Sequence, residues 1–161
     1  MSEAIIFDFA KYGRVFLPVY LKPHDGTIME LVDMKVDTGA DFTTLSKEVL
    51  NDLGYDYKWI KENAITGDKY NMTTAAGGIE AVGLIQIPLA NILGYEASKW
   101  PFRVVMDEKR DFRNLLGRDL LAGFDYTFRN SVGRFEINII GNFVPLYDFI
   151  PGQSINEAID A

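Results

Sequence analysis

The segment Val36-Asp37-Thr38-Gly39-Ala40-Asp41 ends an apolar run with a carboxylate and follows it at once with a tight turn. Asp and Gly are common in turns for backbone reasons alone, so a plain turn is one interpretation. The other is a catalytic acid held on a rigid loop. Gly39 would then leave room for a bound molecule and let backbone N–H groups approach the Asp37 carboxylate.

The composition limits the chemistry to which such an acid could contribute. The chain has no cysteine, which excludes a thiolate nucleophile and a cysteine-based zinc site. Its one histidine, His24, lies in KPHDGT, whose residues are typical of a hairpin turn. A Ser-His-Asp triad or a histidine metal site would depend on that residue alone. Carboxylates therefore remain as the catalytic groups, and we expect neither a metal nor a cofactor.

The charge and length of the chain indicate its class. A formal charge of -7 without a local Lys/Arg cluster disfavours nucleic-acid and anionic-membrane partners. The first 23 residues are interrupted by charges and resemble neither a signal peptide nor a membrane span, so a cytoplasmic location is expected. The 161 residues suit one domain, and the many Phe and Tyr residues favour a β architecture.

The elements around Asp37 can be predicted from the residue pattern. Residues 14–22 and 27–36 form a predicted β-hairpin whose second strand delivers Asp37. One face of that strand is expected to carry Ile28, Val32, Met34 and Val36. A short helix should follow, with Ser46 as N-cap, Val49, Leu50 and Leu53 on one face, and Gly54 at its end. Residues 55–70 are predicted to be a strand or an extended connection.

The second half of the chain predicts more strands. Residues 71–89 should form two strands around Ala76-Gly77-Gly78, and residues 99–106 another strand. A charged loop, 107–114, precedes LLGRDLLAGF, which should pass from a short strand through Gly117 into a helical turn. The last predicted strand is residues 134–140.

Three features now fall in order: the strand ending in VDTGAD, the glycine-tipped hairpin TTAAGGIEAVG and the element LLGRDLL. Together they resemble the retroviral-type (retropepsin-like) aspartic proteases over residues 14–139. The resemblance implies a mostly-β, single-domain fold: a closed barrel with a flap hairpin and one or two short helices. We expect an N-terminal extension at 1–13, the protease domain at 14–140 and a C-terminal extension at 141–161. The aromatic run NFVPLYDF is either a self-processing site or, more simply, packed core or edge strand.

The resemblance also implies an activity. Two carboxyl groups that share one proton can activate water and protonate a departing amine. The sequence contains a single Asp-Thr-Gly, so a pair requires two chains. The expected function is therefore that of a homodimeric aspartic endopeptidase acting on extended, largely apolar segments of a peptide or protein substrate. Asp37 would be the catalytic acid and base, and the Thr38 hydroxyl would bond across the dimer axis.

Further site residues follow from the same resemblance. Ala40 and Asp41 should contact the substrate, and Arg118 after Gly117 should form an intrachain ion pair with Asp41 as structural support. The flap tip should comprise Ala76, Gly77, Gly78 and Ile79, with Gly67 as an alternative tip. Two unrelated surface charges and an ordinary surface hairpin are the alternative interpretations.

Two other hypotheses remain open for the whole chain. In one, the same fold serves as a catalytically silent module for peptide binding or dimerisation. In the other, the chain is a generic β-rich domain in which the motifs coincide by chance.

Overall fold

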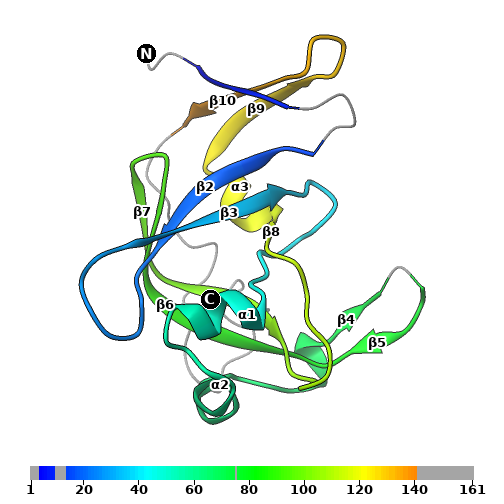
Figure 1. Ribbon diagram of the computed structural model, residues 1–161. Helices are drawn as coiled ribbons and strands as arrows, with labels where there is room; N and C mark the ends of the chain where they lie inside the picture. Colours follow the sequence, from blue (N-terminus) through cyan, green and yellow to red (C-terminus); the bar gives the residue numbers. More distant parts are fainter. Residues whose placement is uncertain (1–3, 10–13, 75, 141–161) are drawn as a thin grey trace.

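The computed structural model describes residues 4–9, 14–74 and 76–140, and strands are its main regular structure, as predicted (Figure 1). The strands are β1 (Ile5–Asp8), β2 (Phe16–Leu21), β3 (Glu30–Val36), β4 (Met72–Thr73), β5 (Ile79–Glu80), β6 (Val82–Ile92), β7 (Tyr95–Val105), β8 (Leu115–Leu116), β9 (Phe124–Arg129) and β10 (Arg134–Ile139). The helices are α1 (Lys47–Asp52), α2 (Tyr57–Asn63), the 3-10 turn η1 (Asp68–Tyr70) and α3 (Arg118–Leu121).

A five-stranded sheet in the order β7-β6-β2-β3-β8 curls around the core. The predicted β2–β3 hairpin is confirmed, and its inward residues alternate along both strands as a half-buried sheet requires. Val32, Met34 and Val36 are buried as predicted. Ile28 is not: it lies in the turn before β3 and is 82% exposed. The β3 strand therefore begins later than the apolar pattern suggested.

Helix α1 forms where the sequence predicted it. The Ser46 side chain accepts a hydrogen bond from the Val49 N–H at 3.1 Å, and Gly54 follows the helix with a φ of +90°. Leu50 and Leu53 are buried, while Val49 is half-buried. The apolar stripe of a short helix thus packs α1 against the sheet beside the Asp37 loop.

The prediction for residues 55–70 was wrong, because Tyr57–Asn63 form a helix, α2. Asp56 caps it by accepting the Trp59 N–H at 2.8 Å, and Ile60 packs into the core. Three α-helices are therefore present in the described part of the chain rather than one or two. The Asp56 cap was the signal that could have revealed the helix.

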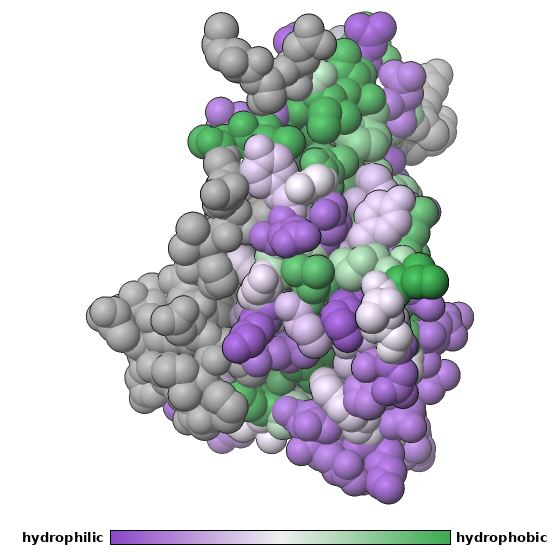
Figure 2. Space-filling view, turned by 90° about the vertical axis from the view of Figure 1, so that its left-hand side faces the viewer, coloured by the Kyte–Doolittle hydropathy of each residue, from purple (hydrophilic) through white to green (hydrophobic). Residues whose placement is uncertain are grey.

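A second sheet has the order β1-β10-β9, all antiparallel. The predicted last strand is confirmed as β10, but β9 and β1 were not predicted. Tyr126, Phe128 and Phe135 pack on one another between these strands. Figure 2 shows apolar side chains gathered at the height of this sheet, above a more polar lower half. The proposed C-terminal extension, with NFVPLYDF, lies outside the described residues.

The second predicted hairpin is present as β4 and β5, with Met72 opposite Glu80 and Thr73 opposite Ile79. It projects from the body of the molecule on the side of the loop that follows β3 (Figure 1). We call residues 72–80 the flap hairpin. It continues through Ala81 into β6, so the flap and the main sheet share one stretch of backbone.

Candidate active site

Asp37 follows the last residue of β3 and lies where β3 and β8 run parallel. Its backbone N–H donates to the Leu116 carbonyl at 3.0 Å, which joins the Asp-Thr-Gly loop directly to the LLG element. The half-buried Asp37 side chain accepts the Gly39 N–H at Oδ1, 3.0 Å away. This hydrogen bond ties one carboxylate oxygen to the backbone of the turn. The loop therefore holds the acid in one orientation.

Gly117 brings LLGRDLL into close contact with the same loop. A Cβ at this position would lie 2.5 Å from the Phe42 carbonyl carbon and 3.0 Å from the Ala40 oxygen. Just beyond it, the Arg118 N–H donates to the Ala40 carbonyl at 2.8 Å. The absent side chain is thus what allows the two backbones to pack together.

The side chains of Arg118 and Asp41 form the ion pair that the sequence predicted. Both are largely exposed, at 61% and 64% of their side-chain area. Exposed pairs contribute little to stability, so this pair mainly orients Asp41 at the edge of the site. The backbone beside it is fixed independently, since the Asp119 N–H donates to the Asp41 carbonyl at 3.2 Å.

Beneath the loop lies a buried carboxylate that the sequence reasoning missed, that of Asp119. It is 3% exposed and accepts the Thr43 hydroxyl at 2.7 Å and the Trp100 ring N–H at 3.2 Å. The Thr43 oxygen in turn accepts the Gly117 N–H at 3.0 Å. Burial raises the pKa of the Asp119 carboxyl above its ordinary value, while its hydrogen bonds oppose the shift. Asp119 thus joins the LLG element, the DTG segment and β7.

A groove opens next to Asp37, formed by two adjoining hollows of about 550 and 420 Å³. The larger one contains Asp37, and the smaller one contains Asp41 and Arg103. Both are lined by Gly39, Ala40, Thr44, Met72, Thr73 and Leu115. The groove therefore runs between the Asp-Thr-Gly loop and the first strand of the flap hairpin, a shape that suits an extended chain.

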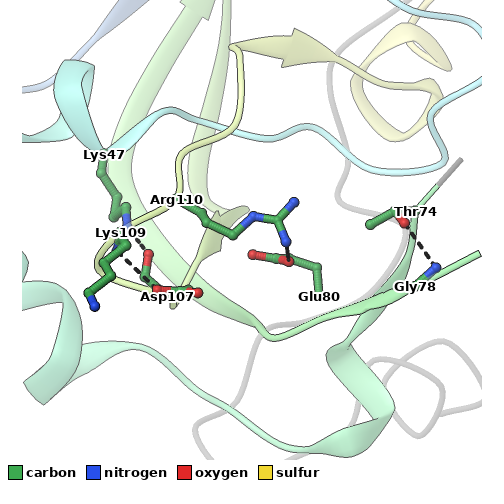
Figure 3. Close-up of polar contacts among 7 residues, drawn as sticks. All are labelled: Lys47, Thr74, Gly78, Glu80, Asp107, Lys109 and Arg110. Carbon is green, nitrogen blue, oxygen red and sulfur yellow. Dashed lines mark hydrogen bonds and ion pairs between the residues drawn. The ribbon is translucent and has the colours of Figure 1, made fainter. Parts of the chain in front are cut away.

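A hairpin turn lies at the residues that were predicted to form the flap tip, but these residues do not line the groove. Ala76, Gly77, Gly78 and Ile79 are exposed, whereas Met72, Thr73 and Thr74 face the hollow that contains Asp37. Thr74 shapes the tip, because its hydroxyl accepts the Gly78 N–H at 3.1 Å (Figure 3). The alternative tip, Gly67, precedes η1 and lines neither hollow.

The base of the flap hairpin is tied to the loop of residues 107–114. The Glu80 carboxylate is 5% exposed and forms an ion pair with Arg110 at 3.1 Å (Figure 3). The same loop is anchored to α1, since the Asp111 carboxylate accepts the Lys47 N–H at 2.8 Å. These ties fix the segment that supplies Phe112 and Arg113 to the groove.

His24 lies elsewhere, in the turn between β2 and β3, with its ring against those of Tyr55 and Trp59. Among the described residues, no three His, Asp or Glu side chains gather as a metal site would require. Nor does the described part of the chain contain a helix with the length and apolar character needed to cross a bilayer.

The curled, mostly-β sheet with a DTG loop, an apolar-apolar-Gly element beside it and a hairpin over the adjoining groove defines a retropepsin-like domain. The sequence model of the family described as gag-polyprotein putative aspartyl protease matches residues 29–122, and the chain belongs to that family. The match contains both motifs and confirms the resemblance as well as a general aspartic-protease-like function. No curated protein and no solved structure gave a significant match.

Gly117→Ala should destabilise the protein, because the backbone of Phe42 and Ala40 cannot move away from the added methyl without breaking the loop contact. We expect a loss of about 1–3 kcal/mol in the free energy of unfolding, measured in urea. Gly78→Ala is the matched control, since its Cβ would come no nearer than 3.4 Å to the Thr74 hydroxyl oxygen. Equal effects of the two substitutions would contradict the close-contact explanation.

Asp119→Asn should have a cost that depends on pH. The native state holds the Asp119 proton more tightly than the unfolded state, because burial raises its pKa. Its contribution to the free energy of unfolding is therefore largest below the unfolded-state pKa, about 3.9, and declines as pH rises through the native pKa.

An Asn side chain does not titrate in this range. Its amide N–H would face the Trp100 ring N–H, so two donors would meet where a donor and an acceptor meet in the wild type. We expect a destabilisation of about 1–3 kcal/mol, greatest near about pH 4 and smaller toward about pH 7. Urea unfolding of wild type and variant at matched concentration and a series of pH values measures the difference. A destabilisation by Asp119→Asn that stays constant or grows with pH would show that the pKa of Asp119 is not raised in the native state.

Proposed function

We propose that the chain is a homodimeric aspartic endopeptidase that hydrolyses peptide bonds in extended segments of peptides or proteins. The observation that carries the proposal is the half-buried Asp37 carboxylate at the edge of a groove lined by the flap hairpin. A carboxylate held by a backbone N–H beside such a groove is suited to act on a bound chain. The cytoplasmic location expected from the sequence stays a prediction.

In the proposed mechanism, Asp37 of each subunit supplies one carboxyl group. Like charges that lie close together do not both ionise readily, so the pair keeps one proton. The ionised group takes a proton from water, which attacks the amide carbonyl carbon, and the protonated group polarises the carbonyl oxygen. The carboxyl groups then deliver a proton to the departing nitrogen as the carbon–nitrogen bond breaks.

Dimerisation is supported by the position of the loop. The sequence has one Asp-Thr-Gly, and Thr38 and Gly39 are exposed in the single chain although they adjoin the reacting acid. A symmetry mate packed on this loop would exclude solvent from both Asp37 carboxylates. The Thr38 hydroxyl would then bond across the axis.

The neighbouring residues support binding of an extended peptide. Asp41, oriented by Arg118, lies at the end of the groove next to Gly39 and Ala40. The exposed flap tip, Ala76 to Ile79, would close over the peptide and pair with its backbone as an added strand does. Closure around the peptide exchanges water for fixed protein dipoles at the reacting bond.

Asp37→Asn should abolish cleavage of a peptide library between mildly acidic and neutral pH while leaving the dimer intact. The amide cannot take the proton from water, and we expect activity to fall at least about 1000-fold. Mass spectrometry of the digests measures cleavage, and sedimentation measures the dimer. Unchanged cleavage by the variant would refute the mechanism, and a dimer that binds peptides without wild-type turnover would favour the silent module.

An experiment that mixes wild-type and Asp37→Asn subunits tests whether each active site needs two Asp37 residues. Wild type and Asp37→Asn, combined in equal amounts and allowed to exchange subunits, should show about a quarter of the activity of an all-wild-type sample at the same total concentration. Mixed dimers would hold one carboxyl and one amide and would be inactive. Half the activity would instead show that each chain works alone.

A further inference from the structure

The hollow of the groove that contains Asp37 is lined by two cationic side chains that the mechanism does not use, those of Lys35 and Arg113. Lys35 lies on β3, two residues before Asp37, and its neighbours Met34 and Val36 face the core. Arg113 comes from the anchored loop of residues 107–114 and is exposed. The two residues therefore reach the same hollow from different elements.

Neither cation forms an ion pair with a carboxylate in the part of the chain that the structure describes. Other arginines differ in this respect: Arg110 is paired with Glu80, and Arg129 with Glu136. Among the described residues, Asp37 is the one carboxylate that lines the 550 Å³ hollow together with Lys35 and Arg113. Two positive charges thus lie beside the reacting group in a chain whose net charge is -7.

The hollows on either side of this cationic region carry charges of both signs. Lys35 and Arg113 also line a further hollow of about 610 Å³, which contains Arg14 together with Asp33, Glu48 and Asp111. Asp111 is occupied with the first N–H groups of α1. On the other side of Asp37, Asp41 is paired with Arg118. The smaller hollow also contains Arg103, whose guanidinium lies over the Phe42 ring. Cations therefore outnumber carboxylates in the hollow that contains Asp37, whereas the 610 Å³ hollow has as many carboxylates as cations.

From this arrangement, and building on the proposed peptidase function, we infer that the groove selects peptides that carry an Asp or Glu side chain next to the cleaved bond. Lys35 and Arg113 are the specificity-determining residues. Side chains two residues apart on an extended strand are separated by about 7 Å, so Lys35 lies within one or two substrate residues of the Asp37 carboxylate. Met72, Phe112 and Leu115 provide apolar contact for the neighbouring substrate side chains.

The inference changes the substrate expected from the sequence, which was largely apolar. An acidic protein repels acidic peptides at long range, whereas the two cations attract a carboxylate at contact distance. Selectivity should consequently depend on the position of the acidic residue in the peptide and not on the total charge of the peptide.

Binding to the Asp37→Asn protein tests this separately from catalysis. The probes are fluorescein-labelled octapeptides of identical composition, with a central apolar pair and one Glu placed either beside that pair or at the far end. A second set has Gln in place of Glu. Fluorescence anisotropy should show roughly three- to tenfold tighter binding for Glu beside the central pair than for Gln there, and no such ratio at the far end.

The ratio of the affinity for the Glu peptide to that for the Gln peptide should fall toward one in Lys35→Gln and in Arg113→Gln, each combined with Asp37→Asn. Lys58→Gln is the matched control, because Lys58 is an exposed cation on α2 that lines neither hollow of the groove. Thermal unfolding of each variant checks folding. Charge reversal, Lys35→Glu with Arg113→Glu, should turn the preference toward peptides with Lys beside the central pair.

Equal binding of the Glu and Gln peptides, no binding of any peptide, or a preference that survives loss of both cations would overturn the inference. Selective binding by the Asp37→Asn protein without any cleavage by wild type would instead remove the endopeptidase proposal and leave the groove inference standing. Cleavage by wild type with no preference for a nearby acidic residue would support the endopeptidase proposal and remove the inference about the groove.

Discussion

The close contact between the Gly117 backbone and residues 40–42 is the constraint on which the rest of the site depends. A Cβ at Gly117 would lie 2.5 Å from the Phe42 carbonyl carbon, so only glycine permits this approach. The approach places the Leu116 carbonyl 3.0 Å from the Asp37 N–H and the Arg118 N–H 2.8 Å from the Ala40 carbonyl. Two segments about 80 residues apart along the chain are thereby held as one unit.

The buried Asp119 side chain holds these two segments together on the core side of the loop. Its two carboxylate oxygens receive hydrogen bonds from Thr43 and Trp100, so one side chain joins the loop to β7. A buried carboxylate is costly unless its lone pairs are satisfied, and here both oxygens are. The exposed Arg118–Asp41 pair is energetically secondary by comparison, although the sequence made it the more visible of the two features.

Local patterns predicted the parts of the fold that local interactions determine. The β2–β3 hairpin, α1 with its Ser46 cap, and the short strand before α3 follow from alternation, capping and glycine placement. Helix α2 was missed because aromatic and charged residues obscure its short apolar face. Strand β1 owes its place to pairing with β10, more than a hundred residues away, and no local pattern specifies such a partner.

The candidate site likewise combines features that local sequence patterns predict with features that depend on long-range contacts. Asp37, Thr38, Gly39 and the Arg118–Asp41 pair could be proposed from two short motifs. The role of Asp119 depends on Thr43 and Trp100, and the charge of the groove depends on Lys35 and Arg113 meeting in space. Such properties arise from tertiary packing, which composition and spacing do not contain.

The flap hairpin combines a fixed base with an exposed tip, and the burial of Glu80 explains the difference. Its carboxylate is 5% exposed, and Oε1 has no hydrogen-bond partner among the described residues, so Arg110 supplies most of its compensation. Moving the base away from the 107–114 loop would leave that charge uncompensated, which is strongly unfavourable. In the part of the chain that the structure describes, the tip has no such anchor: Gly77 and Gly78 are exposed, and their hydrogen bonds stay within the turn. The proposed closure over the groove would therefore involve the few residues around the tip, while Met72 and Thr73 would remain as the wall of the groove.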